Sequence, residues 1–245
     1  MRETLSSTLT RPETSRRIWR SAGICVLAFL LMMVGCGSKE DKRAKFYEKG
    51  LNLYEQGDYV KARLEFKNAI QIDPKFAQAY HMLGMTEIEE GDLQKAYGLL
   101  RKAVELDPDL TESQAELGRI LFLGRQTEQA REKMELVLDR EPGHWTGRLV
   151  KAMLLVSEEK PEEAKSLLKT LIEEKPDRVE PYFILTGIHA AEDDLDAAAG
   201  TLEDLLAQDT TNRAGRVRLA MILERQGNLE DAEKEYQTLL EQDPE

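Results

Sequence analysis

Few residues of this chain have the types and spacing that catalysis would require. Two Ser-x-x-Lys sequences, at residues 157–160 and 166–169, match the pattern in which a lysine activates a serine nucleophile in penicillin-binding enzymes. Both lie in or beside segments of helical periodicity and lack the partner motifs of those enzymes, so we interpret them as chance matches. The sequence also has no glycine-rich phosphate-binding loop. We therefore predict that the protein is not an enzyme.

Metal binding has equally little support in the sequence. The three histidines, His81, His144 and His189, are far apart and show no spacing that would bring them together on a metal ion. The acidic run at residues 192–194 could hold a weakly bound cation, but a solvated turn between two helices is the favoured interpretation. No metal and no cofactor is expected.

The residue with the clearest chemistry is Cys36. It follows a 15-residue apolar run at residues 21–35, which is preceded by a polar segment that carries arginines. The run is shorter than the roughly 20 residues that span a bilayer, and its order, basic then apolar, is that of a secretory signal peptide. The sequence Met33-Val34-Gly35-Cys36 resembles the lipobox of bacterial lipoproteins, in which the signal is cleaved and the cysteine becomes a lipidated N-terminus. An uncleaved anchor and ordinary signal cleavage are the alternatives.

This resemblance predicts how the chain begins. Residues 1–35 would be the signal peptide and residues 36–42 a short tether that carries acyl chains such as palmitate on Cys36. Several acyl chains anchor far more firmly than one. A twin-arginine signal at Arg16 and Arg17 is less favoured than a plain basic flank. Cys25 would leave with the signal, so the mature chain would hold no disulfide. By resemblance to lipoproteins of two-membrane bacteria, Gly37-Ser38 implies the outer membrane, with the protein facing the periplasm.

The charge of the chain excludes some partners. The formal net charge is −12, and it is more negative without residues 1–35, which hold five arginines and two glutamates. Binding to nucleic acid needs clustered lysine and arginine, and adhesion to anionic lipid needs a basic surface. We expect neither, and we attribute the charge to solvated helix faces.

The rest of the sequence is organised by a repeat of 34 residues. Small residues and a closing proline recur in phase, and each copy holds two apolar-periodic segments of roughly 13 to 14 residues, which is long enough for helices. The first two copies show the pattern at Phe46, Gly50, Gly57, Ala62, Phe66, Ala69 and Pro74, and at Tyr80, Gly84, Gly91, Ala96, Leu100, Ala103 and Pro108. The six copies cover residues 43–245, at 43–76, 77–110, 111–144, 145–178, 179–212 and 213–245.

The repeated residues have physical roles. Gly57 supplies a turn between two helices, where positive φ is needed, and Pro74 disfavours helical geometry in the residue before it. Gly50 and Ala62 are small because two helices cross closely there, and a larger side chain at Gly84 or Ala96 should overpack the crossing at a cost of about 1–3 kcal/mol. Packing is the favoured role for all of these residues.

This pattern resembles the tetratricopeptide repeat family. The resemblance implies an all-α fold, a right-handed α-α superhelix of six helix–turn–helix repeats, whose concave face is lined by the first helix of each copy. On that face the family pattern places a protein-binding groove at Tyr47, Leu51, Tyr54, His81, Met85, Ile88, Arg119, Phe122 and Met153. Family members that clamp a peptide carboxylate have Lys, Asn and Arg where this chain has Tyr47, Leu51 and Ala115, so that ligand class is not expected.

The groove is expected to be apolar over its first four copies. Met85, Met153 and Met221 recur in alternate copies, and methionine is an adaptable lining for apolar partners. The expected partner is therefore an apolar or amphipathic protein segment. The alternative, that these side chains are half-buried packing, is equally favoured in the early copies and is favoured in the last two.

The last copy has no further helix after it, and solenoid ends normally need a polar cap. Leu219, Leu223, Leu239 and Leu240 are therefore expected to lack cover. Self-association through this repeat, another partner, or continuation of the protein beyond Glu245 would each explain the sequence.

The signal, the lipobox and the repeats together resemble the repeat lipoproteins of bacterial envelope systems. The start of the mature chain resembles the tetratricopeptide lipoprotein of the PEP-CTERM sorting and exopolysaccharide system. This implies a non-enzymatic scaffold that helps assemble an envelope export complex. The alternatives are a type IV pilus lipoprotein that assists secretin assembly, an accessory subunit of a polysaccharide synthase or cell-wall enzyme, and a groove that binds polysaccharide directly.

Overall fold

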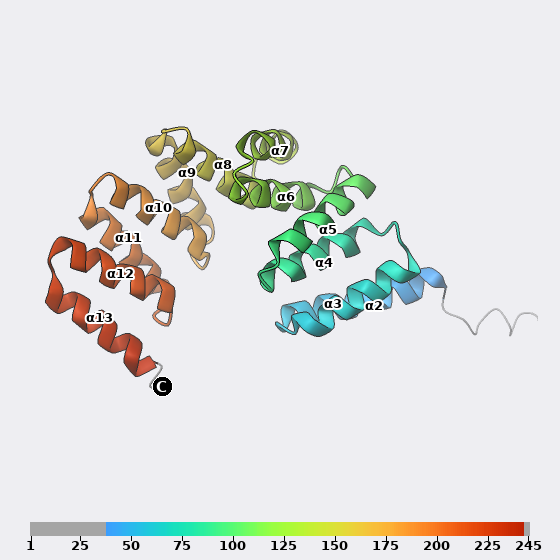
Figure 1. The fold of residues 1–245 in the computed structure, drawn as a ribbon, viewed down its shortest axis with the longest axis horizontal. Coiled ribbons are helices and arrows are strands. Elements are labelled where there is room, and N and C mark those ends of the chain that lie inside the picture. The colour runs from blue at the N-terminus through green and yellow to red at the C-terminus, as the bar shows by residue number, and fades with distance from the viewer. Residues whose placement is uncertain (1–37, 243–245) are drawn as a thin grey trace, which may run out of the picture. The chain divides into compact units, whose positions relative to one another are not determined.

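The computed structural model describes residues 38–242, and within this range the chain forms twelve α-helices and no strand (Figure 1). The expected signal segment, Cys36 and Gly37 lie outside the described residues. The helices form consecutive helix–turn–helix pairs, which confirms the expected all-α fold class. The pairs are α2 (Lys39–Glu55) with α3 (Tyr59–Ile72), α4 (Ala77–Glu89) with α5 (Leu93–Leu106), α6 (Thr111–Leu123) with α7 (Thr127–Arg140), α8 (Trp145–Ser157) with α9 (Pro161–Glu174), α10 (Val179–Ala191) with α11 (Leu195–Gln208), and α12 (Arg213–Gln226) with α13 (Leu229–Gln242).

The helices divide between two compact units. The first ends at Pro74 and holds the pair α2–α3, and the second begins at Lys75 and holds α4 to α13. In the second unit each first helix packs against its own second helix, and each second helix also contacts the first helix of the next pair from α5 to α12. The core of this unit therefore runs continuously from pair to pair.

The first helix starts earlier than the repeat pattern predicts. Ser38 is its N-cap: the Ser38 hydroxyl accepts a bond of 3.0 Å from the Asp41 amide, and an Asp41 carboxylate oxygen accepts one of 2.7 Å from the Ser38 amide. This reciprocal capping box satisfies two amides that the helix itself leaves unbonded. Lys39 to Lys42 are therefore helical, although they fall in the segment expected to be tether.

The turn inside each pair has one backbone feature in common. The residue at the place of Gly57 has positive φ in all six pairs: Gly57, Gly91, Arg125, Glu159, Asp193 and Gly227. Side chains other than glycine are strained in this region. The geometry of the turn thus imposes the left-handed conformation even where the sequence has no glycine.

Small residues lie where the helices of a pair cross, as predicted. A Cβ on Gly50 would lie 2.6 Å from Phe66 Cε1, and one on Gly84 would lie 2.9 Å from Leu100 Cγ. Ala96 is fully buried at the same crossing as Gly84. After the second helix of the first pair, Asp73 is extended (φ −132°), which agrees with the restriction that Pro74 places on it.

The last pair corrects one expectation. Leu219, Leu223 and Leu239 are buried, and only Leu240, at 69% exposure, lacks cover. Leu219 and Leu223 pack in one cluster with Ala232 of α13 and with Leu202 of α11. The second helix of the pair covers the first. The expectation that Leu219, Leu223 and Leu239 would be exposed at the end of the solenoid was therefore wrong.

Residues 38–242 have neither a helix suited to span a membrane nor a cluster suited to hold a metal ion. No helix in this range has the length and apolar character that crossing a bilayer requires. No group of three or more His, Cys, Asp or Glu side chains in the same range is arranged to hold a metal ion.

Candidate protein-binding face

The predicted groove residues all lie on first helices and are all half-buried. In the first unit the Tyr47 ring lies against Phe66, with 5.8 Å between ring centroids, and the Tyr54 ring lies against Tyr59 at 5.3 Å. Burial raises the pKa of Tyr47 above its usual value. The predicted residues of the second unit are His81, Met85, Ile88, Arg119, Phe122 and Met153. Each of these side chains therefore contributes to packing and also leaves part of its surface open to solvent.

The surface that α4, α6, α8, α10 and α12 form in the second unit is called here the first-helix face. In its early part Ile88 and Phe122 both pack against the cluster built on Leu117 and Leu121. Met85 and Met153 are not part of the buried clusters of the described residues. The early part of the face thus mixes core-facing and open side chains.

Polar contacts join neighbouring first helices, and sequence reasoning missed them. Ser113 Oγ on α6 lies 2.9 Å from His81 Nδ1 on α4, and Thr146 Oγ1 on α8 donates to Glu116 Oε1 at 3.3 Å. Arg119 Nε donates to Glu116 Oε2 at 2.7 Å. Burial lowers the pKa of His81, which favours the neutral ring. The face is therefore more polar at α6 than the expected apolar groove, because Glu116 fixes Arg119 there.

The later part of the face is more open than expected. Val217 and Met221 on α12 are 40% and 55% exposed, and Val156 on α8 is 41% exposed. The expectation that the last two copies use these positions for packing is wrong for Val217 and Met221. The α12 helix buries its opposite side, including Leu219 and Leu223, against α11 and α13, so these two positions point away from the core.

A hollow of about 430 Å³ lies on this later part. Its lining comes from the end of α8, the turn into α9 and the length of α10: Val156, Glu159, Pro161, Phe183, Ile184, Gly187, Ile188, Ala191 and Glu192. Gly187 is exposed, and a Cβ there would meet no atom within 4 Å. The equivalent places in other pairs hold Met85, Arg119, Met153 and Met221. The absence of a side chain at Gly187 therefore helps to open the hollow.

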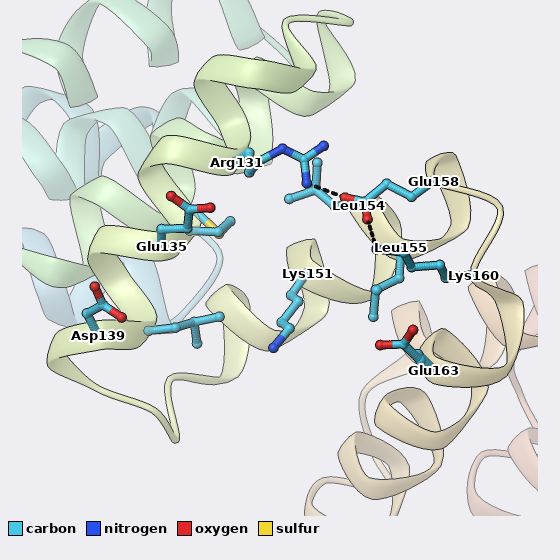
Figure 2. Close-up of a pocket in the computed structure, with 11 residues that line it drawn as sticks. Arg131, Glu135, Asp139, Lys151, Leu154, Leu155, Glu158, Lys160 and Glu163 are labelled. Carbon is cyan, nitrogen blue, oxygen red and sulfur yellow. Dashed lines mark hydrogen bonds and ion pairs between the residues drawn. The ribbon is translucent and has the colours of Figure 1, made fainter.

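A second pocket, of about 380 Å³, lies between α7, α8 and α9 (Figure 2). Charged side chains dominate its wall, and Figure 2 shows Arg131 and Lys160 converging on Glu158. The hydrogen bonds from Lys160 and Arg131 lower the pKa of Glu158 to about 2. A carboxylate that stays ionised at neutral pH is a poor general acid. The pocket thus consists of paired charges without the arrangement of an acid–base site.

Ser157 and His144, which the sequence singled out, have structural roles. Ser157 Oγ donates to the Leu154 carbonyl at 2.7 Å, while Lys160 is bonded to Glu158. His144 caps α8 by accepting a bond from the Gly147 amide at 3.1 Å. His189 is buried on α10. These observations give Ser157 no activating base and leave the histidines in separate places.

Comparisons with known proteins agree with the helix pairs. Two family models, both described as tetratricopeptide repeat, match residues 53–115 and 189–245, and residues 149–213, and together they cover more than half of the chain. A search of curated protein sequences found no significant match.

Solved structures share the fold at low sequence identity. PilW, described as a widely conserved type IV pilus biogenesis factor, is 17% identical, with a TM-score of 0.68 over 82% of this chain and 94% of its own. PilF of Pseudomonas aeruginosa is 16% identical, with a TM-score of 0.62 over 85% of this chain and 95% of its own. The thermophilic repeat protein TTC0263 of Thermus thermophilus is 21% identical, with a TM-score of 0.62 over 74% of this chain and 98% of its own. With its in-phase helix pairs and these matches, the chain belongs to the tetratricopeptide repeat family.

Proposed function

We propose that this protein is a non-enzymatic scaffold, anchored by lipid at Cys36 in the bacterial cell envelope and facing the periplasm from the outer membrane. It helps to assemble an export complex of the exopolysaccharide or protein-sorting type. Family membership supports a role in binding proteins. The lipobox-like sequence ending at Cys36 supports the anchor.

One observation carries the scaffold role. The first-helix face presents apolar side chains that are partly or largely open, from Met85 on α4 to Met221 on α12. A soluble helical surface normally has polar residues at such places, so open apolar positions that recur along one face indicate an interaction surface. Helix-in-groove recognition, in which an amphipathic helix lays its apolar face on such a surface, fits this spacing.

A second candidate is a role in type IV pilus biogenesis, as an aid to secretin assembly. The likeness to PilW favours this candidate, because it covers 94% of the PilW chain and PilW is described as a type IV pilus biogenesis factor. At 17% identity this likeness carries the fold and not the partner. Both candidate functions include the lipid anchor and protein binding at the first-helix face. They differ in which partner protein binds there.

Photocrosslinking in the cell tests the proposal and separates the candidates. A photoreactive residue replaces Ile88, which is half-buried on the face, and a matched control carries it at Glu132, which is exposed on the second helix α7. Capture of a polysaccharide synthesis or export component from Ile88 and not from Glu132 supports the first candidate. Capture of a secretin subunit supports the second. Identical products from both positions, or a second copy of this chain alone, would refute a scaffold role for this face.

A further inference from the structure

We infer that the hollow around Gly187 receives an apolar side chain from a basic amphipathic segment of a partner protein. This inference rests on the proposed scaffold function and specifies which part of the face makes the contact and what the partner must carry. The hollow lies within the second unit, between the turn that joins α8 to α9 and the turn that joins α10 to α11. These two turns are called here its rim.

The floor of the hollow is apolar and fixed. Ile188 is 5% exposed and belongs to the buried cluster of α8, α9 and α10. The Phe183 ring packs against the cluster of α11 and α12, and the Arg218 guanidinium lies 4.3 Å from the ring centroid. Val156 remains open to solvent at the edge. An apolar side chain seated here would cover Val156 and part of Phe183, which both line the hollow, and burial of apolar surface favours binding.

Gly187 has no structural reason to be glycine. Its φ is not in the left-handed region, and a Cβ added there would meet no atom within 4 Å. Glycine in a helix interior is less favourable than alanine. This differs from Gly84 and Gly118, which are hemmed in by Leu100 and Met134. At Gly187 the missing side chain instead leaves room for a side chain from outside.

The rim of the hollow is acidic. Glu159 and Glu192 line the hollow, and the two segments that carry them, residues 158–163 and 192–196, each a turn and the start of the next helix, hold eight carboxylates in all: Glu158, Glu159, Glu162, Glu163, Glu192, Asp193, Asp194 and Asp196. Four basic side chains reach them within ion-pair distance, namely Arg131 and Lys160 on Glu158, Lys165 on Glu162 and Glu192, and Arg225 on Asp193. The two turns therefore keep an excess of negative charge.

Two acidic residues of the rim stand out. Glu159 lines the hollow and has no ion-pair partner among the described residues, and Asp193 is 87% exposed in its side chain, with Arg225 at 3.5 Å. Both have positive φ, at the place where three other pairs have glycine. Lysine or arginine beside the apolar side chain of the partner would meet these carboxylates. An acidic partner would be repelled, so the charge selects a basic one.

A peptide-binding measurement on the full chain tests the inference. The protein is purified in a non-ionic detergent because of the apolar run at residues 21–35. The probe is a labelled 18-residue amphipathic helix with leucines on one face and lysines beside them. A second probe has the same leucines with glutamates in place of the lysines. Fluorescence anisotropy reports binding of each peptide at low and moderate salt.

Two sets of variants localise the binding. Gly187→Met fills the hollow with the residue that Met153 and Met221 provide elsewhere, and Gly98→Met is its control, because Gly98 is also an exposed helical glycine with open space around it. Glu159→Gln combined with Asp193→Asn removes two rim charges. Its control, Glu132→Gln with Glu141→Gln, removes two exposed charges from α7 and its end. Binding of peptide to detergent is the same in every variant and its control.

We expect the lysine peptide to bind the wild type with an affinity that falls as salt is added. Its affinity should fall at least tenfold in Gly187→Met and severalfold in the rim variant. Both control variants should bind it as the wild type does. Equal binding of the glutamate peptide, or equal affinity in Gly187→Met and Gly98→Met, would overturn the inference. If Ile88 still captures its envelope partner while Gly187→Met has no effect, the hollow is excluded and the scaffold function stands. Loss of all capture at Ile88 would instead count against the scaffold function itself.

Discussion

The sharpest stability prediction compares one substitution at two glycines, Gly84→Ala and Gly98→Ala. Both glycines are inside helices of the second unit, so alanine gains about 1 kcal/mol of helix propensity at either site. At Gly98 the new methyl group would meet no atom within 4 Å. At Gly84 it would lie 2.9 Å from Leu100 Cγ and 3.0 Å from Leu100 Cδ2. The difference between the two variants therefore isolates the cost of crowding at the helix crossing.

The magnitude follows from the surroundings of Leu100. Its side chain is fully buried and packs in one cluster with Leu117, Ile120 and Leu121, so it has no open space into which to move. Overpacking a filled core costs about 1–3 kcal/mol. Gly98→Ala should thus be more stable than the wild type by about 1 kcal/mol. Gly84→Ala should lie about 1–3 kcal/mol below Gly98→Ala.

Thermal unfolding followed by circular dichroism measures this difference. For a chain of this size about 1 kcal/mol corresponds to roughly 2–4 °C in Tm, so the two variants should differ by about 2–12 °C. Both must show the wild-type helical spectrum before heating. Because repeat proteins can unfold in stages, the same wavelength and scan rate are used for both variants. A Gly84→Ala variant as stable as Gly98→Ala would refute the crossing argument, because that argument rests on the contact between the new methyl group and Leu100.

Two further predictions concern charge and anchoring. In Glu158→Gln, stability should fall at neutral pH, because hydrogen bonds from Lys160 and Arg131 hold the Glu158 pKa near 2, below its unfolded value of about 4.5. The stabilisation is present above pH 4.5 and is lost as the pH falls through 2, so the wild type and the variant should converge over that range in urea unfolding; a constant gap would contradict this. Cys36→Ser should release the protein from the membrane fraction, as cell fractionation would show, and a variant that stays in that fraction would contradict lipid anchoring at this residue.

The positions of the helices could be predicted because the information is local and repeated. Small residues such as Gly84 and Ala96 mark the crossings, and Asp58 after Gly57 marks the start of a second helix, whose Lys61 amide it caps at 3.2 Å. The start of the first helix could not be read from the repeat. It depends on Ser38 and Asp41, which form a capping box before the first copy of the repeat begins.

The candidate face was only partly predictable, because the position of a residue within the 34-residue repeat does not by itself determine how exposed its side chain is. Val217 and Met221 were expected to pack, but they lie on the side of α12 that faces away from α11 and α13. Ser113 and Glu116 were missed because each depends on a partner one repeat away, His81 and Thr146 respectively. A contact between repeats requires two suitable residues at once, and the pattern of one repeat cannot show that.

The helical glycines of the second unit differ in whether close helix packing explains why they are glycine. Gly84 and Gly147 each face a buried side chain within 3 Å, so the crossing itself explains them. Gly98 and Gly187 both face open space, so openness alone does not mark a site. Gly187 combines an open Cβ direction with an apolar floor and acidic turns beside it. If that combination is functional, Gly187→Met should stabilise the fold through helix propensity, by roughly 1 kcal/mol, while it weakens partner binding. A substitution that raises Tm and lowers affinity together cannot be explained by loss of structure, and a rise in Tm with unchanged affinity would return Gly187 to the same class as Gly98.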